Sequence, residues 1–129
     1  MPQKILIVED NTDMSDLLAV YLRSGGYQIS LAQNSAEGIK KASTERPDLI
    51  ITDLHLPDMT AVEATERLKQ DPVTSSIPIV VLTAMTVGDW KSKALAAGVA
   101  DYLTKPISLR ALLNVVRKML PTPSVFTER

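Results

Sequence analysis

Five short apolar segments alternate along the chain with five segments whose apolar residues recur at helical spacing. The expected strands are residues 5–8, 29–32, 49–51, 79–82 and 102–103. Most of these segments are almost continuously apolar, which is typical of parallel strands covered on both faces; the fifth is weak alone and is placed by the alternation. Strands separated by helices of this length predict right-handed crossovers. The chain is therefore expected to form an α/β fold, a doubly wound five-stranded parallel sheet in a three-layer sandwich.

The segments between the strands indicate amphipathic helices with recognisable ends. Gly25-Gly26 ends the first helix and Gly98 the fourth, as glycines commonly do. Ser35 is an N-cap candidate for a helix to about Glu45, and Ser108 for the last helix. The apolar stripes are Met14, Leu17, Leu18, Tyr21 and Leu22 in the first helix, Val62, Thr65 and Leu68 in the third, Trp90, Ala94 and Ala97 in the fourth, and Leu109, Leu112, Leu113, Val116 and Leu120 in the fifth.

Length and composition fit one domain and exclude several kinds of site. The 129 residues suit a single core, expected over residues 1–120. Residues 121–129 contain two prolines and no periodicity, so they are expected to be a flexible tail or the start of a linker. The chain has no cysteine and one histidine, which excludes a disulfide framework, a thiolate metal site and a histidine-rich metal site.

The charge balance and the apolar runs limit the partners. The net charge of -1 gives no electrostatic reason for nucleic-acid binding. The longest apolar runs are far too short to span a bilayer, and residues 1–4 lead into the first strand without a signal-peptide pattern. We therefore expect a soluble, cytoplasmic protein that binds neither membrane nor nucleic acid directly.

Acidic residues follow two of the expected strands. Glu9 and Asp10 come after the first strand and Asp53 after the third; Thr83 ends the fourth, and Lys105 follows the fifth. Ligands of open parallel sheets bind beyond the carboxyl ends of the strands. Because the first and third strands are expected to be neighbours, the three carboxylates should meet there.

Three carboxylates in one pocket repel each other and favour a cation. At about 4 Å and an effective dielectric constant of about 20, each like-charged pair costs on the order of 4 kcal/mol. Oxygen ligands suit Mg²⁺, which together with Lys105 makes the cluster neutral. Asp53 is then free to attack phosphorus, with Lys105 and the Thr83 hydroxyl as partners for phosphoryl oxygens. The alternative for each acid taken alone is that it caps the following helix.

Four motifs together resemble the receiver domain of two-component response regulators, from residue 4 to about 120. They are Val8-Glu9-Asp10-Asn11, Asp53-Leu54-His55-Leu56-Pro57, Leu82-Thr83-Ala84 and Lys105-Pro106. The resemblance implies a flavodoxin-like (βα)5 fold of the single-domain type. It also implies a phosphoprotein that is not an enzyme acting on a separate substrate, but catalyses its own phosphorylation and dephosphorylation.

The resemblance also implies roles for the acidic residues. Asp53 would be the phosphoacceptor, and Glu9, Asp10, Asp53 and the backbone carbonyl of His55 would bind Mg²⁺. The phosphoryl donor would be a phosphohistidine on a histidine kinase or on a histidine phosphotransfer protein of a phosphorelay. The side chain of His55 is expected to be a solvated loop residue.

A conformational switch is implied as well. Thr83 and Lys105 would contact the phosphoryl group, Thr83 would move toward it, and Tyr102 would turn inward. This would remodel the face made by the fourth helix, fifth strand and fifth helix, where a downstream protein or output domain binds. The alternative for Tyr102 is that it is an aromatic residue of an edge strand and packs on the fourth helix. Trp90 is expected to be a packing residue of that helix and not a binding hot spot. A weak homodimer through the fourth and fifth helices is compatible with the pattern.

Two positions depart from the family's usual pattern, and two others are expected to affect the lifetime of the phosphoryl group. Thr60-Ala61 stand where the family usually has Asp-Gly, and because alanine tolerates positive φ less well, a differently shaped loop is expected after Asp53. Met85 and His55 occupy positions that tune the lifetime of the phosphoryl group in the family. The resemblance further implies a cis peptide bond at Lys105-Pro106.

Rival functions lack their motifs. A dinucleotide enzyme needs a glycine-rich turn after the first strand, where this chain has Glu9-Asp10-Asn11-Thr12. An aspartyl phosphatase needs a second aspartate two residues after a nucleophile at the first strand, which is also missing. The remaining alternative is a pseudo-receiver, which has the same fold but acts only as a protein-interaction module.

Overall fold

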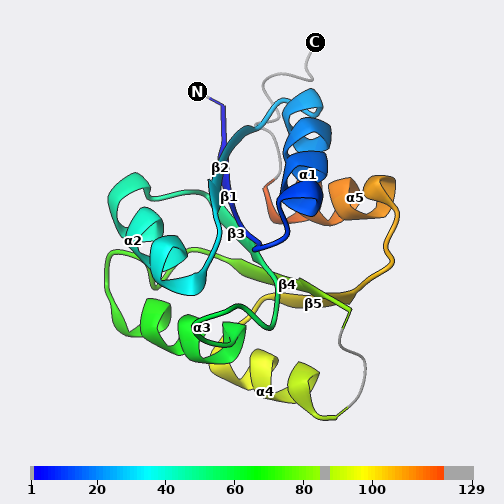
Figure 1. The fold of residues 1–129 in the computed structure, drawn as a ribbon. Helices are drawn as coiled ribbons and strands as arrows, with labels where there is room; N and C mark the ends of the chain where they lie inside the picture. The colour runs from blue at the N-terminus through cyan, green and yellow to red at the C-terminus, as the bar shows by residue number, and fades with distance from the viewer. Residues whose placement is uncertain (1, 85–87, 121–129) are drawn as a thin grey trace.

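The structure, a computed structural model that describes residues 2–84 and 88–120, contains five strands and five helices in strict alternation (Figure 1). All five expected strands and all five expected helices are present, with ends within a residue or two of the expected ones. The elements are β1 Lys4–Val8, α1 Thr12–Ser24, β2 Gln28–Ala32, α2 Ser35–Glu45, β3 Leu49–Thr52, α3 Ala61–Gln70, β4 Ile79–Thr83, α4 Trp90–Ala97, β5 Asp101–Thr104 and α5 Leu109–Met119.

One parallel sheet joins all five strands in the order β2-β1-β3-β4-β5. β1 lies between β2 and β3, and in its register with β3 Val8 is opposite Thr52. At the other edge of the sheet, Thr83 of β4 is opposite Thr104 of β5. The expected adjacency of the first and third strands is therefore confirmed, and the carboxyl ends of β1 and β3 lie side by side.

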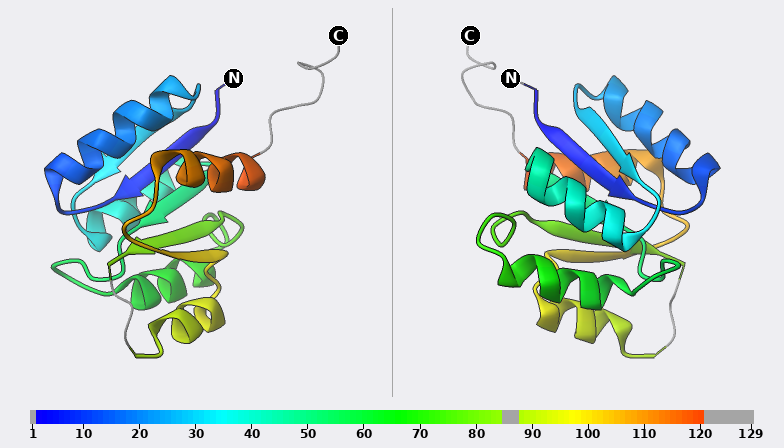
Figure 2. Two further views of the ribbon diagram at one scale, coloured as in Figure 1. Left: turned by 90° about the vertical axis from the view of Figure 1, so that its right-hand side faces the viewer. Right: turned by 60° about the vertical axis from the view of Figure 1, so that its left-hand side comes forward.

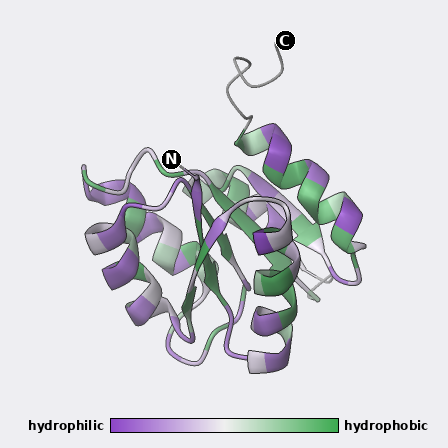
Figure 3. Ribbon diagram, turned by 90° about the horizontal axis from the view of Figure 1, so that it is seen from above, coloured by the Kyte–Doolittle hydropathy of each residue, from purple (hydrophilic) through white to green (hydrophobic). Residues whose placement is uncertain are grey.

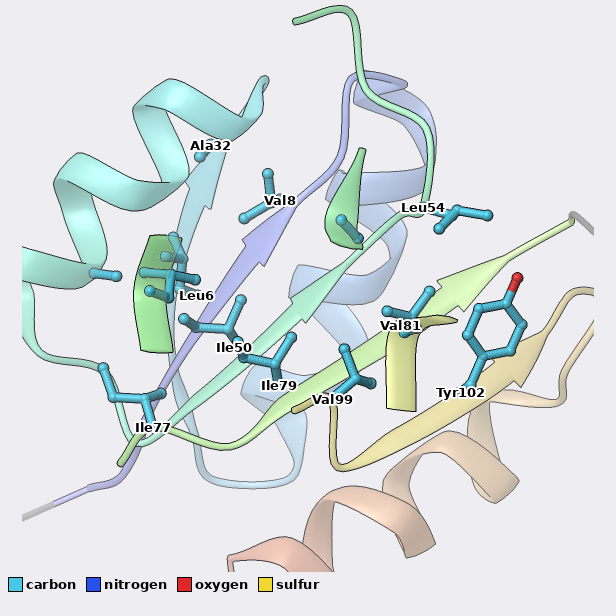
Figure 4. Close-up of a cluster of buried hydrophobic side chains, with 14 residues drawn as sticks. Leu6, Val8, Ala32, Ile50, Leu54, Ile77, Ile79, Val81, Val99 and Tyr102 are labelled. Carbon is cyan, nitrogen blue, oxygen red and sulfur yellow. The ribbon is translucent and has the colours of Figure 1, made fainter. Parts of the chain in front are cut away.

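Helices cover both faces of this sheet, with α1 and α5 on one side and α2, α3 and α4 on the other (Figure 2). Alternate residues of one strand serve the two sides: Ile5 and Ile7 pack in the core beneath α1 and α5, whereas Leu6 and Val8 pack beneath the other three helices (Figure 4). Hydrophobic residues concentrate on the strands and on the helix sides turned toward them (Figure 3). The three-layer α/β fold is thus confirmed, and burial on both faces explains the continuous apolar runs.

The helix ends follow capping rules, with one correction. Ser108 is the N-cap residue of α5, as expected, and its hydroxyl accepts the Ala111 N–H at 3.0 Å. The N-cap residue of α2 is Asn34 and not Ser35, because the Asn34 Oδ1 atom accepts the Glu37 N–H at 2.8 Å. Ser35 is the first helical residue, and its hydroxyl instead donates to the Met59 carbonyl at 3.3 Å. Gly98 ends α4 with φ at 114°.

The loop between β3 and α3 accommodates Ala61 without a left-handed residue. Ala61 is the fully buried first residue of α3, and the hydroxyl of Thr60 caps this helix by accepting the Glu63 N–H at 3.3 Å. In the described part of the chain, Arg46 is the one non-glycine residue with positive φ. The Lys105-Pro106 peptide bond is cis, as expected. No helix within the described ranges is long and apolar enough to cross a membrane.

A buried hydroxyl without a partner yields a stability prediction. Thr65 is 1% exposed, and its Oγ1 atom has no hydrogen-bond partner. Because valine has nearly the same shape and no polar atom to desolvate, Thr65→Val is expected to raise the free energy of unfolding by about 1 kcal/mol in urea titrations.

The matched control is Thr74→Val. Thr74 is equally buried, but its Oγ1 atom donates to the Leu68 carbonyl at 2.7 Å. This variant should lose about 1–3 kcal/mol, because it leaves a buried carbonyl without that donor. Equal losses in both variants would contradict the assignment of Thr65 as unpartnered.

Candidate functional site

Three carboxylates and one ammonium group meet at the carboxyl end of the sheet. Oxygen atoms of Glu9, Asp10 and Asp53 lie within 4.8 Å of one another. The Lys105 Nζ atom is 3.1 Å from Glu9 Oε1 and 3.8 Å from Asp53 Oδ2. The structure therefore brings together four of the residues singled out in the sequence, from three separate segments of the chain.

The sheet itself positions these side chains. Hydrogen bonds of the parallel ladder continue one residue past the strand ends: the Asp53 N–H donates to the Val8 carbonyl at 3.1 Å, and the Lys105 N–H to the Thr83 carbonyl at 2.7 Å. The Asp53 Oδ1 atom accepts the Leu54 N–H at 2.7 Å. Asp53 thus has one oxygen held by the N–H of the next residue, while the other lies toward Lys105.

Negative charge is costly at Glu9. This residue is 4% exposed, and burial raises the pKa of its carboxyl group above the ordinary value of 4.5. The Asn11 N–H and Lys105 pull the pKa back down, whereas the charge of Asp53 raises it further. The cluster is thus a place where a cation is favoured, and its carboxylate oxygens are the ligand type that Mg²⁺ prefers.

Helix capping does not account for this cluster. The N-cap residue of α1 is Asn11, whose Oδ1 atom accepts the Met14 N–H at 3.0 Å. Glu9 contributes to the same turn by accepting the Asn11 N–H at 3.1 Å, but its other oxygen faces Lys105. Since Asn11 supplies the side-chain cap, the carboxylates of Glu9 and Asp10 are available for another role.

Thr83 and Tyr102 belong to β4 and β5, the two strands beyond β3 in the sheet. Thr83 ends β4 and is 3% exposed. Tyr102 is 7% exposed, and Figure 4 shows its ring beside Val81 with the hydroxyl directed toward the end of the sheet where Leu54 lies. Burial and then the charge of Asp53 raise the pKa of Tyr102 above 10.0. The ring also belongs to the core that contains Ala94 of α4, so the packing role weighed from the sequence is met.

His55 contacts the fourth helix rather than the carboxylates. Its side chain is exposed, as expected, and its ring meets Trp90 edge-on at a centroid distance of 5.2 Å. The Lys93 Nζ atom lies 4.9 Å from the centroid of the same Trp90 ring. Trp90 packs against the core, in line with its expected role. Met85, the other position expected to tune the phosphoryl lifetime, lies outside the described residues.

Sequence reasoning missed Asp58. Its two carboxylate oxygens accept the N–H groups of Ser35 at 2.9 Å and of Ala36 at 2.8 Å. No local pattern signals a contact between residues 23 positions apart, because capping rules consider only neighbours in the chain. The contact becomes visible only when the loop after β3 is placed beside α2.

Comparisons with known proteins agree with this fold. The family model of the response regulator receiver domain matches residues 5–117. The chain therefore belongs to the response regulator receiver domain family, whose members are phosphoacceptor signalling proteins of two-component systems.

Among its relatives, Protein PilH of Pseudomonas aeruginosa is 35% identical over 91% of this chain and 97% of its own length. The phosphate regulon transcriptional regulatory protein PhoB of the same species is 38% identical over 90% of this chain. The chain spans about half of PhoB, 51% of its length. A solved structure that is similar to this chain is the receiver domain of a sensor histidine kinase of Pseudomonas aeruginosa, with a magnesium ion coordinated in its active-site cleft. The two structures match with a TM-score of 0.84 and 30% sequence identity, and the match covers 92% of this chain and 98% of the other.

The raised pKa of Glu9 predicts that its charge destabilises the metal-free protein. The folded state binds more protons than the unfolded state between pH 4.5 and the raised pKa, so Glu9 makes stability fall as pH rises through that window. Glu9→Gln is expected to raise the melting temperature in metal-free buffer at neutral pH, and the gain over the wild type should shrink as pH falls toward 4.5.

Glu63→Gln is the control, because Glu63 is exposed and pairs with Arg67 on the surface of α3. Exposed pairs contribute about 0–1 kcal/mol, so this variant should change the melting temperature little. A Glu9→Gln protein that is less stable than the wild type in metal-free buffer would show that the Lys105 contact outweighs burial.

Proposed function

We propose that this receiver domain is a phosphoacceptor switch that accepts a phosphoryl group on Asp53. The observation that carries the proposal is the cluster of Glu9, Asp10 and Asp53 with Lys105, 3.8 Å from Asp53. The donor is a phosphohistidine on a histidine kinase or a histidine phosphotransfer protein, and the exchange takes place in the cytoplasm. The unit that folds around this site is residues 1–120; residues 121–129, which lie outside the described ranges, serve as a tail or linker.

The carboxylates of Glu9, Asp10 and Asp53, with the His55 carbonyl, fit Mg²⁺ as an oxygen ligand set. The bound ion would neutralise negative charge as a phosphate approaches a carboxylate. Lys105, which is 3.8 Å from Asp53, and Thr83, which ends β4, would contact the phosphoryl oxygens.

The transfer uses the Asp53 oxygen that faces Lys105. The Oδ1 atom already accepts the Leu54 N–H, which leaves Oδ2 as the nucleophile. An O–P bond forms at Oδ2 while the N–P bond of the phosphohistidine breaks, and the imidazole keeps the electron pair of that bond. Dephosphorylation ends the signal by hydrolysis. A water molecule attacks phosphorus, the O–P bond breaks, inorganic phosphate departs with the protons of the water, and Asp53 is again a free carboxylate.

The switch is a response to added charge. A phosphoryl group on Asp53 would add negative charge at the end of the sheet where Thr83 and Tyr102 lie. The pKa of the Tyr102 hydroxyl is already raised, first by burial and then by the charge of Asp53. α4 is weakly anchored, because Ala94 is its one buried residue and the N-cap Asp89 makes no side-chain cap bond. We infer that Thr83 and Tyr102 transmit the change to the face of α4, β5 and α5, which a downstream protein or output domain reads. A weak homodimer would use the same face.

Asp53 is expected to be the residue that receives the phosphoryl group. With Mg²⁺ and a small acyl phosphate, intact-mass measurement should show one added phosphoryl group on the wild type and none on Asp53→Asn, because the carboxamide cannot attack phosphorus. The control is Asp89→Asn. The carboxylate of Asp89 pairs with Lys93 of α4, so this variant should be phosphorylated like the wild type. An adduct that persists in Asp53→Asn would contradict the assignment.

Magnesium alone is expected to stabilise the native protein. At ten times the dissociation constant, a ligand that binds only the native state adds about 1.4 kcal/mol to the free energy of unfolding. The melting temperature should therefore rise with millimolar MgCl₂, and the rise should be absent in Asp10→Asn, which removes one charge of the cluster. A wild type that shows neither a shift nor phosphorylation would be a pseudo-receiver, a protein-interaction module of the same fold.

A further inference from the structure

The loop between β3 and α3 is fastened to the start of α2 by three hydrogen bonds. Asp58 Oδ1 accepts the Ser35 N–H at 2.9 Å and Asp58 Oδ2 accepts the Ala36 N–H at 2.8 Å. The Ser35 hydroxyl donates to the Met59 carbonyl at 3.3 Å. We call this set of contacts, made by Ser35 and Ala36 with Asp58 and Met59, the loop clamp.

The loop clamp completes the capping of α2. The first N–H groups of a helix lack intrahelical acceptors, and the helix dipole favours a negative charge beside them. The Asn34 side chain accepts only the Glu37 N–H. Asp58 supplies acceptors for the N–H groups of the two residues between Asn34 and Glu37, which are Ser35 and Ala36. Both partners are thereby held by strong, charge-assisted bonds.

Asp58 remains ionised over the physiological range. Burial by itself raises the pKa of its carboxyl group, but the N–H groups of Ser35 and Ala36, with those of Asp58 and Met59, lower it more strongly. The net pKa lies below the ordinary value of 3.8. The clamp therefore stays charged at neutral pH.

α2 is a rigid support for this clamp because it packs directly on β1. Gly38, in the first turn of α2, approaches Val8 so closely that a Cβ atom on it would lie 2.8 Å from Val8 Cγ2. Val8 immediately precedes Glu9, whose own N–H donates to the Ala32 carbonyl at 2.9 Å. The clamp thus ties the loop to the strand end that carries Glu9.

The same loop carries the His55 carbonyl. The ends of the loop are joined by the bond from the Ala61 N–H to the Leu54 carbonyl at 2.7 Å and by a bridge between His55 and Thr60. These bonds close the loop on itself, whereas the loop clamp fixes where the closed loop sits relative to β1. A lateral shift of the loop would move the His55 carbonyl away from Glu9 and Asp10.

We propose that Asp58 is a positioning residue of the acceptor site, which holds the His55 carbonyl in register with the carboxylates of Glu9, Asp10 and Asp53. This inference rests on the proposed function, in which those oxygens bind Mg²⁺ before Asp53 is phosphorylated. Asp58 touches neither the metal nor the phosphoryl group and acts only through the loop.

The test compares two aspartates that make the same kind of bond at opposite ends of the sheet. Asp58→Asn keeps the size of the side chain but removes its charge and one of its two acceptors. The control is Asp48→Asn: Asp48 Oδ2 accepts the Lys4 N–H at 2.8 Å, where β1 begins. Both variants should lose some stability, measured as a lower urea midpoint.

The two variants should differ in metal affinity. Isothermal titration with MgCl₂ is expected to give a dissociation constant about tenfold higher for Asp58→Asn, the lower end of what loss of an outer-shell partner causes, and an unchanged value for Asp48→Asn. Phosphorylation of Asp58→Asn by a small acyl phosphate should be slow at limiting Mg²⁺ and return to the wild-type rate at saturating Mg²⁺, because the acceptor itself is intact.

The outcomes separate this inference from the proposed function. A wild type that binds Mg²⁺ and is phosphorylated, with an Asp58→Asn protein of equal affinity, would overturn the positioning role alone. Equal weakening in Asp48→Asn would show that general destabilisation, not loop position, controls the affinity, and would also overturn it. A wild type that neither binds Mg²⁺ nor accepts a phosphoryl group would overturn the proposed function itself.

Discussion

The pairing of β1 with β3 is the constraint on which the rest of the site depends. In their register Val8 lies opposite Thr52, and the ladder continues through the bond from the Asp53 N–H to the Val8 carbonyl. This pairing forces carboxylates that repel each other into one small volume. The repulsion persists in the folded state because burial of the hydrophobic residues around the sheet contributes far more free energy than the repulsion costs. The three carboxylates therefore repel one another in the folded protein, and a bound cation would reduce that repulsion.

Contacts from the rest of the fold moderate that repulsion. Lys105 reaches Glu9 and Asp53 from the loop after β5, so the strand at one edge of the sheet neutralises charge near its centre. The start of α2 balances the charge of Asp58 in the neighbouring loop, through the N–H groups of Ser35 and Ala36. Tyr102 connects the site to the core beneath α4. A charge change at Asp53 would consequently act on several elements at once, as the proposed switch requires.

The sequence predicted the architecture well because each layer leaves its own periodicity. Strands buried on both faces appear as unbroken apolar runs, and the N-cap at Ser108 and the end of α4 at Gly98 follow local rules. Even the weak fifth strand, Asp101–Thr104, was placed correctly by alternation. The N-cap of α2 was predicted one residue late, because both Asn34 and Ser35 are good caps. Only the structure shows that Asn34 accepts the Glu37 N–H while the Ser35 hydroxyl donates to Met59.

The sequence by itself determined the order of the strands and helices, the family, and the convergence of Glu9, Asp10, Asp53 and Lys105 at one end of the sheet. It did so because strand ends, once the sheet is parallel, leave little freedom for the residues that follow them. Only the tertiary structure decided how the loop after β3 is held, with Asp58 on α2 and His55 against Trp90. Loop contacts of this kind join residues far apart in the chain. The contact of Asp58 with α2 also depends on the close packing of Gly38 on Val8, which no local pattern encodes.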